Sequence, residues 1–459
     1  MTSSNPALSD ILHQSSRCLA QVQSGRSLTL ALAQAPQILR PAVQSVTWYA
    51  MRHWGLACAW RAQLLARQPD KPWLAAHLSL TLLLLDAAMQ AHGQALAASL
   101  QTPLSEDCPS YTPHTLVDEA VKAVSLAKLG KPAKGLVNAV LRRFQREHDQ
   151  WVAAVTNDLV ARWNYPAWWI KKLQSDYPQD WQSILTASQV RPKLVLRVNS
   201  RQASVQQVVD AFDAAGIDCA AIGGQAVALA QSVAVQTLPG YALGWWSVQD
   251  WSAQQAANLL ELKDGQRVLD ACCAPGGKTA HILELADVDL TALDQDAERL
   301  CRVKENLNRL KLMNDRVKLK VADASDWQSW WDGKPYDVIL ADVPCTASGV
   351  VRRHPDIAWL RREADLTQTV TLQTQILDGL WHTLAPGAIL LLVTCSVFPD
   401  EGEYQAQAFL ARHADAMRLD APGQCLPMAS DEHGQVGDVG QVGHDGFFYA
   451  KFQRQPIRT

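Results

Sequence analysis

The chain has 459 residues, of which 48% are apolar and 19% charged, and its formal net charge is −3 at pH 7. This length exceeds that of one ordinary domain, and the apolar content is typical of a folded protein with a large core, which excludes a disordered chain. The nearly balanced charge excludes a strongly basic protein, so any nucleic-acid binding must come from local patches.

Residues 1–160 are predicted to form an all-α domain. The first residues lack a basic stretch followed by an apolar run, so we expect no secretory signal there. Apolar residues recur at spacings of three and four in "HLSLTLLLLDAAMQAH" and "TLVDEAVKAVSLAKL", as in amphipathic helices. The longest apolar run contains Asp86 and is too short to span a bilayer. We therefore expect a cytoplasmic protein that does not bind membranes.

The segment "LGKPAKGLVNAVLRRFQRE" predicts a further amphipathic helix after a break at glycine and proline. Leu136, Val140, Leu141 and Phe144 share its apolar face, and several lysines and arginines lie on the rest. Two interpretations remain open for these cations: a solvated helix surface, or a surface that contacts phosphates.

Residues 161–240 are predicted to form a connector and a small α/β RNA-binding subdomain. "KLVLRVNS" and "AVALA" are typical of strands, and "SVQQVVDAFDAAGI" between them is typical of a helix. Arg197 and Arg201 lie in or just after the first strand and are candidate RNA contacts.

Residues 241–459 alternate strands with helices. The expected strands are "RVLDA", "DLTALD", "VKLKVAD", "YDVILAD", "AILLLVT" and a closing "GFFYAKF". This order predicts an α/β fold with a doubly wound, mostly parallel, Rossmann-like sheet. Such sheets bind ligands outside the carboxyl ends of their strands.

A glycine turn follows the first of these strands in "VLDACCAPGGKT". It matches neither the G-x-G-x-x-G pattern nor the Walker pattern, so a diphosphate is not required. Acids end the successive strands, and with Asp270 they predict a rim of carboxylates that suits an adenosine-containing ligand with a cationic centre. The residues that this pattern makes candidates for the ligand site are Gly276, Gly277, Asp294, Asp323 and Asp342.

Two cysteines lie at strand ends of the same sheet edge: Cys345 in "LADVPCTASG" and Cys395 in "LLLVTCSVFPDE". A thiolate there can act as a nucleophile. Attack on C6 of a pyrimidine makes C5 nucleophilic enough to take a methyl group, and a second group must then support release. Asp342 is a candidate to hydrogen-bond the base at N3. The remaining isolated thiols are interpreted as packing residues: Cys18, Cys58, Cys108, Cys219, Cys301 and Cys425.

The stretches "SVQDWSAQ", "LDACCAPGGKT", "DVPCTASGVVRRHPDIAWLRR" and "LAPGAILLLVTCSVFPDE" resemble the Nol1/Nop2/Sun family of RNA 5-methylcytosine methyltransferases. The resemblance covers nearly all of residues 248–451. It implies S-adenosylmethionine as methyl donor and small-subunit ribosomal RNA as substrate, with Cys395 as the C6 nucleophile and Cys345 as the thiol that assists release. The cofactor site that it implies comprises Cys273, Ala274, Pro275, Gly276, Gly277, Lys278, Asp294, Asp323 and Asp342. Thr346 stands where a serine is commoner, and Gly402 where an asparagine is frequent. The helical part is similar to the NusB-type RNA-binding domain of one subgroup.

A basic run, Arg352, Arg353, Arg361 and Arg362, follows Cys345 and suggests phosphate contacts beside the target base. The candidate RNA contacts here are Arg352, Arg353 and His354. The alternative is that these arginines pair with acids close by in the sequence, at positions 356, 363 and 365.

Three other readings of the whole chain stay open. One is a methyltransferase that acts on another RNA such as tRNA. The second is a DNA cytosine methyltransferase, in which Cys345 would attack and Cys395 would be idle. The third is a non-catalytic RNA-binding assembly factor. We expect a monomer, and no metal, because the ten cysteines show no C-x-x-C pairs or zinc-like spacing with histidine.

Overall fold

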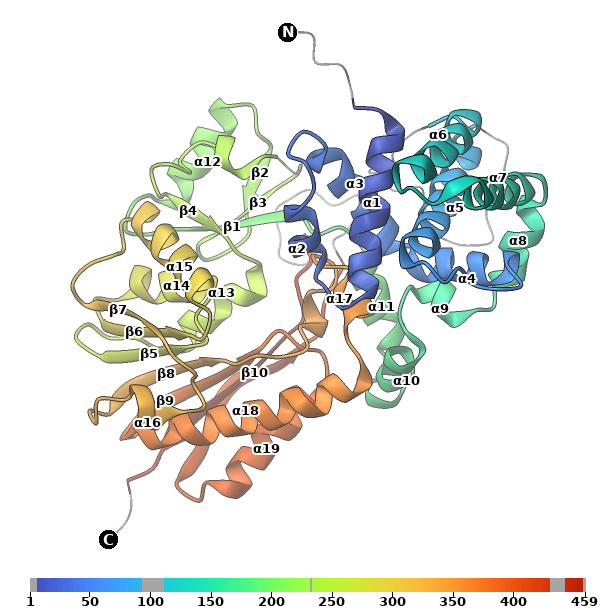
Figure 1. Cartoon of the computed structure of the whole chain (residues 1–459). Helices are drawn as coiled ribbons and strands as arrows, with labels where there is room; N and C mark the ends of the chain where they lie inside the picture. Colours follow the sequence, from blue (N-terminus) through green and yellow to red (C-terminus); the bar gives the residue numbers. More distant parts are fainter. Residues whose placement is uncertain (1–5, 93–110, 232, 430–441, 457–459) are drawn as a thin grey trace. The chain divides into compact units, whose positions relative to one another are not determined.

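A computed structural model describes residues 6–92, 111–231, 233–429 and 442–456 (Figure 1). The chain forms two compact units. The first comprises Met1–Pro178 and His354–Arg362, and the second comprises Gln179–Arg353 and Glu363–Thr459. The first break therefore falls at Pro178, whereas the predicted domain limits at 160 and 240 remain predictions.

The first unit is helical where it is described, as expected from the spacing of apolar residues. Its longest helix, α5, is apolar and long enough to cross a membrane, but 83% of its most apolar window is buried inside the protein. Its buried residues belong to the helical core of this unit. The helices are α1 (Leu8–Gln23), α2 (Leu28–Ala33), α3 (Arg40–Arg52), α4 (Trp54–Leu64), α5 (Pro72–Ala91), α6 (Pro113–Leu126), α7 (Gly130–Arg146), α8 (His148–Val155), α9 (Leu159–Trp163), α10 (Ala167–Asp176) and α17 (Ile357–Leu360).

The segment His354–Arg362 belongs to this helical unit although it lies far along the sequence. Asp356 accepts a hydrogen bond of 2.8 Å from the backbone N–H of Leu28, at the start of α2. Trp359 and Leu360 of α17 pack against the core of the same unit. The cationic helix α7 buries Val140, Leu141 and Phe144, and the NusB-type assignment remains a prediction.

The second unit begins with a small antiparallel sheet in the strand order β2-β3-β1-β4. Ser204 and Gln207 form a capping box that begins the helix α12. Phe212 from this helix packs on Trp246 in the sheet core. The elements are α11 (Trp181–Gln189), β1 (Leu194–Val198), α12 (Val205–Ala214), β2 (Cys219–Ala221), β3 (Ala226–Leu229), η1 (Val235–Thr237) and β4 (Trp246–Val248).

The large sheet has the order β10-β11-β9-β8-β5-β6-β7. Strands β9, β8, β5, β6 and β7 are parallel, and β11 and β10 are added antiparallel. The strands are β5 (Arg267–Ala271), β6 (Asp289–Asp294), β7 (Val317–Val321), β8 (Tyr336–Asp342), β9 (Leu384–Thr394), β10 (Ala416–Cys425) and β11 (Phe447–Arg454). The sequence analysis did not identify β10.

Helices cover both faces of this sheet, which confirms the predicted doubly wound fold (Figure 1). One apolar cluster joins the sheet to α13, α14 and α15, and a second joins its other face to α16, α18 and α19. These elements are α13 (Trp251–Asn258), α14 (Gly277–Leu285), α15 (Ala297–Arg309), α16 (Trp327–Trp330), α18 (Glu363–Thr383) and α19 (Glu403–Arg412), with the short turns η2 (Ser348–Val350) and η3 (Pro399–Glu401).

Candidate active site

The two strand-end thiols lie together. Cys345 follows β8 and Cys395 follows β9, and these two strands are parallel neighbours, so their carboxyl ends meet at one edge. The two Sγ atoms are 3.4 Å apart, and both side chains are half-buried. The two cysteines, which the sequence places at one sheet edge, are therefore in direct sulfur–sulfur contact.

Only one of the two sulfurs can carry a negative charge at a time. The hydrogen bond with Cys395, burial, and the charges of Cys395 and Glu401 all raise the pKa of the Cys345 thiol well above its usual range. Cys345 is therefore the thiol that stays protonated while the two sulfurs are in contact.

A lysine and a carboxylate lie beside the thiols. Lys278 Nζ donates to Asp342 Oδ2 at 2.7 Å, and it also lies 5.2 Å from the ring centre of Phe447. Burial acts to lower the pKa of Lys278, but the Asp342 carboxylate outweighs burial and raises it, with a smaller contribution from Cys395. The ammonium is thus held charged within electrostatic reach of the Cys395 sulfur, where a positive charge stabilises a thiolate.

The predicted cofactor loop turns sharply between β5 and α14. Gly276 has a φ of +93°, and a Cβ there would lie 2.9 Å from a methyl carbon of Val303, so only glycine fits without a shift. The backbone N–H of Ala274 donates to Asp294 at 3.0 Å, and Arg299 donates to the Ala274 carbonyl at 2.6 Å. Asp294 therefore holds the loop as well as ending β6.

The acidic rim follows the strand order. Asp342, Asp294 and Asp323 end or follow β8, β6 and β7, on the two sides of β5. Asp294 is 3% exposed, whereas Asp323 is exposed and accepts from the N–H and hydroxyl of Ser325. Two glycines and these carboxylates at one edge fit a ligand that has ribose hydroxyls and a cationic centre.

Asp270 differs from the other three acids because it is fully buried below the rim. Its Oδ2 accepts from the Thr279 hydroxyl at 2.6 Å, while Oδ1 has no hydrogen-bond partner among the described residues. Burial raises its pKa to about 7, against the lowering effect of Thr279.

A carboxyl with a raised folded-state pKa destabilises the fold as it ionises. The folded chain then binds more protons than the unfolded chain between pH 4 and 7, so stability falls across this window, by at most about 1.4 kcal/mol per pH unit. We expect Asp270→Asn to remove this slope. The measurement is urea unfolding of both proteins from pH 4.5 to 8; parallel curves would show that Asp270 is not the group that titrates.

Arg197, a candidate RNA contact from the sequence, lies inside the protein. Its side chain is fully buried and makes a two-pronged pair with Glu284 of α14, at 2.7 and 2.8 Å. It also donates to the Gly277 carbonyl at 2.8 Å and to Gln249. Arg197 thus ties the small sheet to the cofactor loop. Arg201 is partly exposed and pairs with Asp287 at 2.7 Å.

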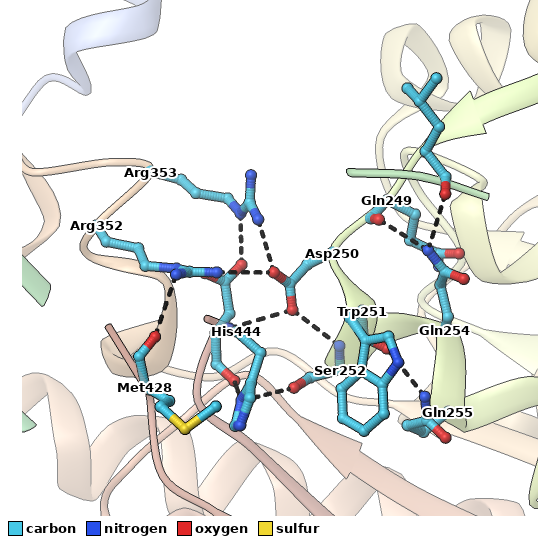
Figure 2. Close-up of polar contacts among 12 residues, drawn as sticks. Gln249, Asp250, Trp251, Ser252, Gln254, Gln255, Arg352, Arg353, Met428 and His444 are labelled. Atoms are coloured by element: carbon cyan, nitrogen blue, oxygen red, sulfur yellow. Dashed lines mark hydrogen bonds and ion pairs between the residues drawn. The ribbon is translucent and has the colours of Figure 1, made fainter. Parts of the chain in front are cut away.

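Arg352 and Arg353 point toward Asp250, as Figure 2 shows. Arg352 Nη2 and Arg353 Nη2 lie 3.0 and 2.6 Å from Asp250 Oδ2, and both guanidinium groups also pair with Asp445. Arg352 is 1% exposed, so its charge serves this buried cluster and not an open surface. Both acids are distant from Arg352 in the sequence, so these two ion pairs differ from the pairing expected with the nearby acids at positions 356, 363 and 365. His354 is exposed and belongs to the first unit.

The cluster predicts a stability effect. Arg352→Met would leave two buried carboxylates facing one guanidinium, and we expect the free energy of unfolding to fall by about 3 kcal/mol. Chemical denaturation measures this loss. The control is Arg302→Met, an exposed arginine of α15, which should change stability by less than about 0.5 kcal/mol. Unchanged stability together with weaker RNA binding would instead support the phosphate contact.

Three residues that join the two cysteine segments are not predicted from the sequence. Glu401, Ser396 and Ser348 are fully or almost fully buried, and none was a candidate. The sequence shows the acids after Cys395 in "FPDEGE", but nothing local distinguishes the fully buried Glu401 from the half-buried Asp400 and Glu403. Among the thiols predicted to pack in cores, Cys301 is exposed, which makes that prediction wrong, and Cys108 lies outside the described residues.

Comparison with known proteins gives consistent matches. Residues 257–453 match the family model described as 16S rRNA methyltransferase RsmB/F, and residues 165–236 match the RsmF/B-like ferredoxin-like domain. The chain is similar to proteins named ribosomal RNA small subunit methyltransferase B. The one from Vibrio vulnificus is 36% identical over 95% of this chain and 96% of its own, and the one from Pseudomonas putida is 46% identical over 74% and 77%.

Solved structures show the same fold. The crystal structure of PH0851 covers 98% of this chain and 99% of its own with a TM-score of 0.74 and 21% identity. A methyltransferase homolog from Pyrococcus horikoshii is 26% identical and covers 65% of this chain and 97% of its own, with a TM-score of 0.53.

Proposed function

Because the chain belongs to the 16S rRNA methyltransferase RsmB/F family, within the Nol1/Nop2/Sun proteins, and is an S-adenosylmethionine-dependent rRNA methyltransferase, we propose a specific reaction for it. The enzyme methylates C5 of one cytosine in small-subunit rRNA, through a covalent bond between Cys395 and C6. The observation that carries this proposal is the 3.4 Å contact between two thiols at the sheet edge that also bears the cofactor loop.

The first step is addition to the base. The Cys395 thiolate bonds to C6, and the negative charge that forms on the ring is neutralised at N3. Asp342 takes a proton from Lys278 along their 2.7 Å hydrogen bond and donates it to N3. The electron-rich C5 is then the nucleophile toward the methyl donor.

S-adenosylmethionine supplies the electrophilic methyl carbon that C5 takes up. In this chain the Ala274–Lys278 loop would hold it, with Asp294, Asp323 and Asp342 as acceptors for its hydroxyl and cationic groups. The glycines let this backbone approach a ligand closely.

Cys345 then supports release. Once Cys395 is bonded to carbon, its hydrogen bond and its charge no longer raise the pKa of Cys345, although burial and the Glu401 charge still do. The Cys345 thiol then loses its proton to solvent. The resulting thiolate takes the C5 proton, the C5–C6 double bond re-forms, Cys395 leaves as thiolate, and the N3 proton returns to Lys278. The enzyme ends in its starting protonation state.

The test is methyl transfer in vitro from labelled S-adenosylmethionine to unmethylated 16S rRNA, followed by bisulfite sequencing to locate the product. We expect label in 5-methylcytosine at one position. Parallel reactions use tRNA and duplex DNA, and we expect neither to be labelled. Label recovered on ribose or on another base atom would reject C5 chemistry.

A further inference from the structure

A buried carboxylate bridges the two cysteine segments. Glu401 lies in the turn η3, six residues after Cys395, and its side chain is fully buried. Its Oε1 accepts from the backbone N–H of Thr346 at 2.7 Å, and its Oε2 accepts from the Thr346 hydroxyl at 2.5 Å. Thr346 is the residue that directly follows Cys345.

Such a bridge is rigid for electrostatic reasons. An ionised carboxylate without water is costly unless hydrogen bonds satisfy it, and hydrogen bonds to a charged acceptor are shorter and stronger than neutral ones. Both oxygens of Glu401 bind the same residue, which fixes direction as well as distance.

Other contacts align the same two segments further along. The hydroxyls of Ser348 and Ser396 are 2.9 Å apart, and the N–H of Gly349 donates to the Cys395 carbonyl at 2.9 Å. The Thr346 bridge involves the residue directly after Cys345, whereas these bonds lie three and four residues from it in the sequence. On the other side of Cys345, Gln373 donates to the Pro344 carbonyl at 2.9 Å, but this bond does not link the two cysteine segments. Loss of Glu401 would therefore act mainly on the placement of Cys345.

We propose that Glu401 is a positioning residue, which through Thr346 sets the Cys345 sulfur beside Cys395 for the release step. This inference rests on the proposed division of labour between the two thiols. Glu401 does not touch the base; it holds the backbone that carries the second thiol. The charge of Glu401 also adds to those that keep Cys345 protonated before the base is attacked.

A thiol cross-linking experiment tests the placement without RNA. Diamide oxidises a close thiol pair: the two thiols lose two hydrogens and form a disulfide, and the azo group of the reagent becomes a hydrazine. The rate for the Cys345–Cys395 pair, followed by peptide mass, reports how often the sulfurs meet. We expect Glu401→Ala to slow it by about tenfold or more, because small displacements have large rate effects.

Matched variants separate placement from folding. Thr346→Val removes only the hydroxyl contact and should slow cross-linking by a smaller factor, whereas Thr346→Ser keeps both contacts and should behave as the unaltered enzyme does. Glu305→Gln, at an exposed position of α15, is the surface control. The proposal is overturned if folded Glu401→Ala cross-links Cys345 to Cys395 as fast as the wild-type enzyme does. If Glu401→Ala does not fold, a wild-type cross-linking rate in Thr346→Val overturns the proposal.

Turnover provides a second readout. We expect Glu401→Ala to lower kcat, to leave KM for S-adenosylmethionine within about twofold, and to accumulate a covalent protein–RNA species. General loss of structure would lower kcat without accumulating the adduct. If cross-linking is slower but no variant accumulates the adduct, the positioning role of Glu401 stands and the proposed release step is rejected. Failure of the positioning role can therefore be distinguished from failure of the release chemistry.

Discussion

Replacement of Cys395 by alanine is expected to abolish methyl transfer, with a fall of at least about 10⁴-fold in kcat, because the sulfur that bonds to C6 is then missing and the remaining thiol, Cys345, is held protonated. Cys395→Ser should be almost as inactive, since a serine hydroxyl is not ionised at neutral pH. The measurement is incorporation of labelled methyl groups into unmethylated 16S rRNA.

The control for this experiment is Cys301→Ala, which removes an exposed thiol of α15 and should retain full activity. Binding of S-adenosylmethionine to Cys395→Ala, measured by calorimetry, should stay within about twofold, because the loop and carboxylates are unchanged. Full-rate methylation by Cys395→Ala would refute the mechanism, and would point to Cys345 as the attacking thiol.

Replacement of Cys345 by alanine is expected to leave bond formation with the RNA intact and to block release. Addition and methyl transfer can still occur, but the base that removes the C5 proton is missing, so the enzyme should remain bonded to its RNA. We expect a protein–RNA species that resists denaturing electrophoresis, with multiple turnover lowered by about 10²-fold or more.

The double variant Cys345→Ala/Cys395→Ala is the matched control, since it lacks the sulfur that forms the bond and should show no such species. Normal turnover by Cys345→Ala would show that another group removes the proton. A lack of both adduct and turnover would assign Cys345 to the addition step.

Much of the catalytic unit could be predicted because its signals are local. Most of the parallel strands are short apolar runs with an acid or a cysteine at or just after their carboxyl ends, and the topology rule then places those ends at one edge. The contact between Cys345 and Cys395 follows once β8 and β9 are neighbours. β10 was not predicted because it is a partly exposed edge strand that contains Pro422 and Gly423, and proline and glycine are uncommon inside strands.

Charged residues were predicted less well, since their partners are set by the fold. From the sequence, Arg352 is expected to contact RNA or, alternatively, to pair with acids close by, yet it pairs with Asp250 and Asp445, which lie far away on both sides along the chain. Arg197 is likewise expected to contact RNA, whereas in the structure it is buried and bonded to Glu284 and the Gly277 carbonyl. A run of arginines shows that charge is present; only tertiary structure shows what neutralises it.

The return of the segment 354–362 to the helical unit has a consequence for how this protein could have been assembled. The backbone passes between the two units after Pro178, after Arg353 and after Arg362, so no single cut frees one from the other. An ancestor made by joining two genes end to end would have only the first of these passages. Trp359 and Leu360 would then have lacked their apolar partners. Exchange of the helical part between relatives should therefore succeed only when this nine-residue stretch is exchanged with it.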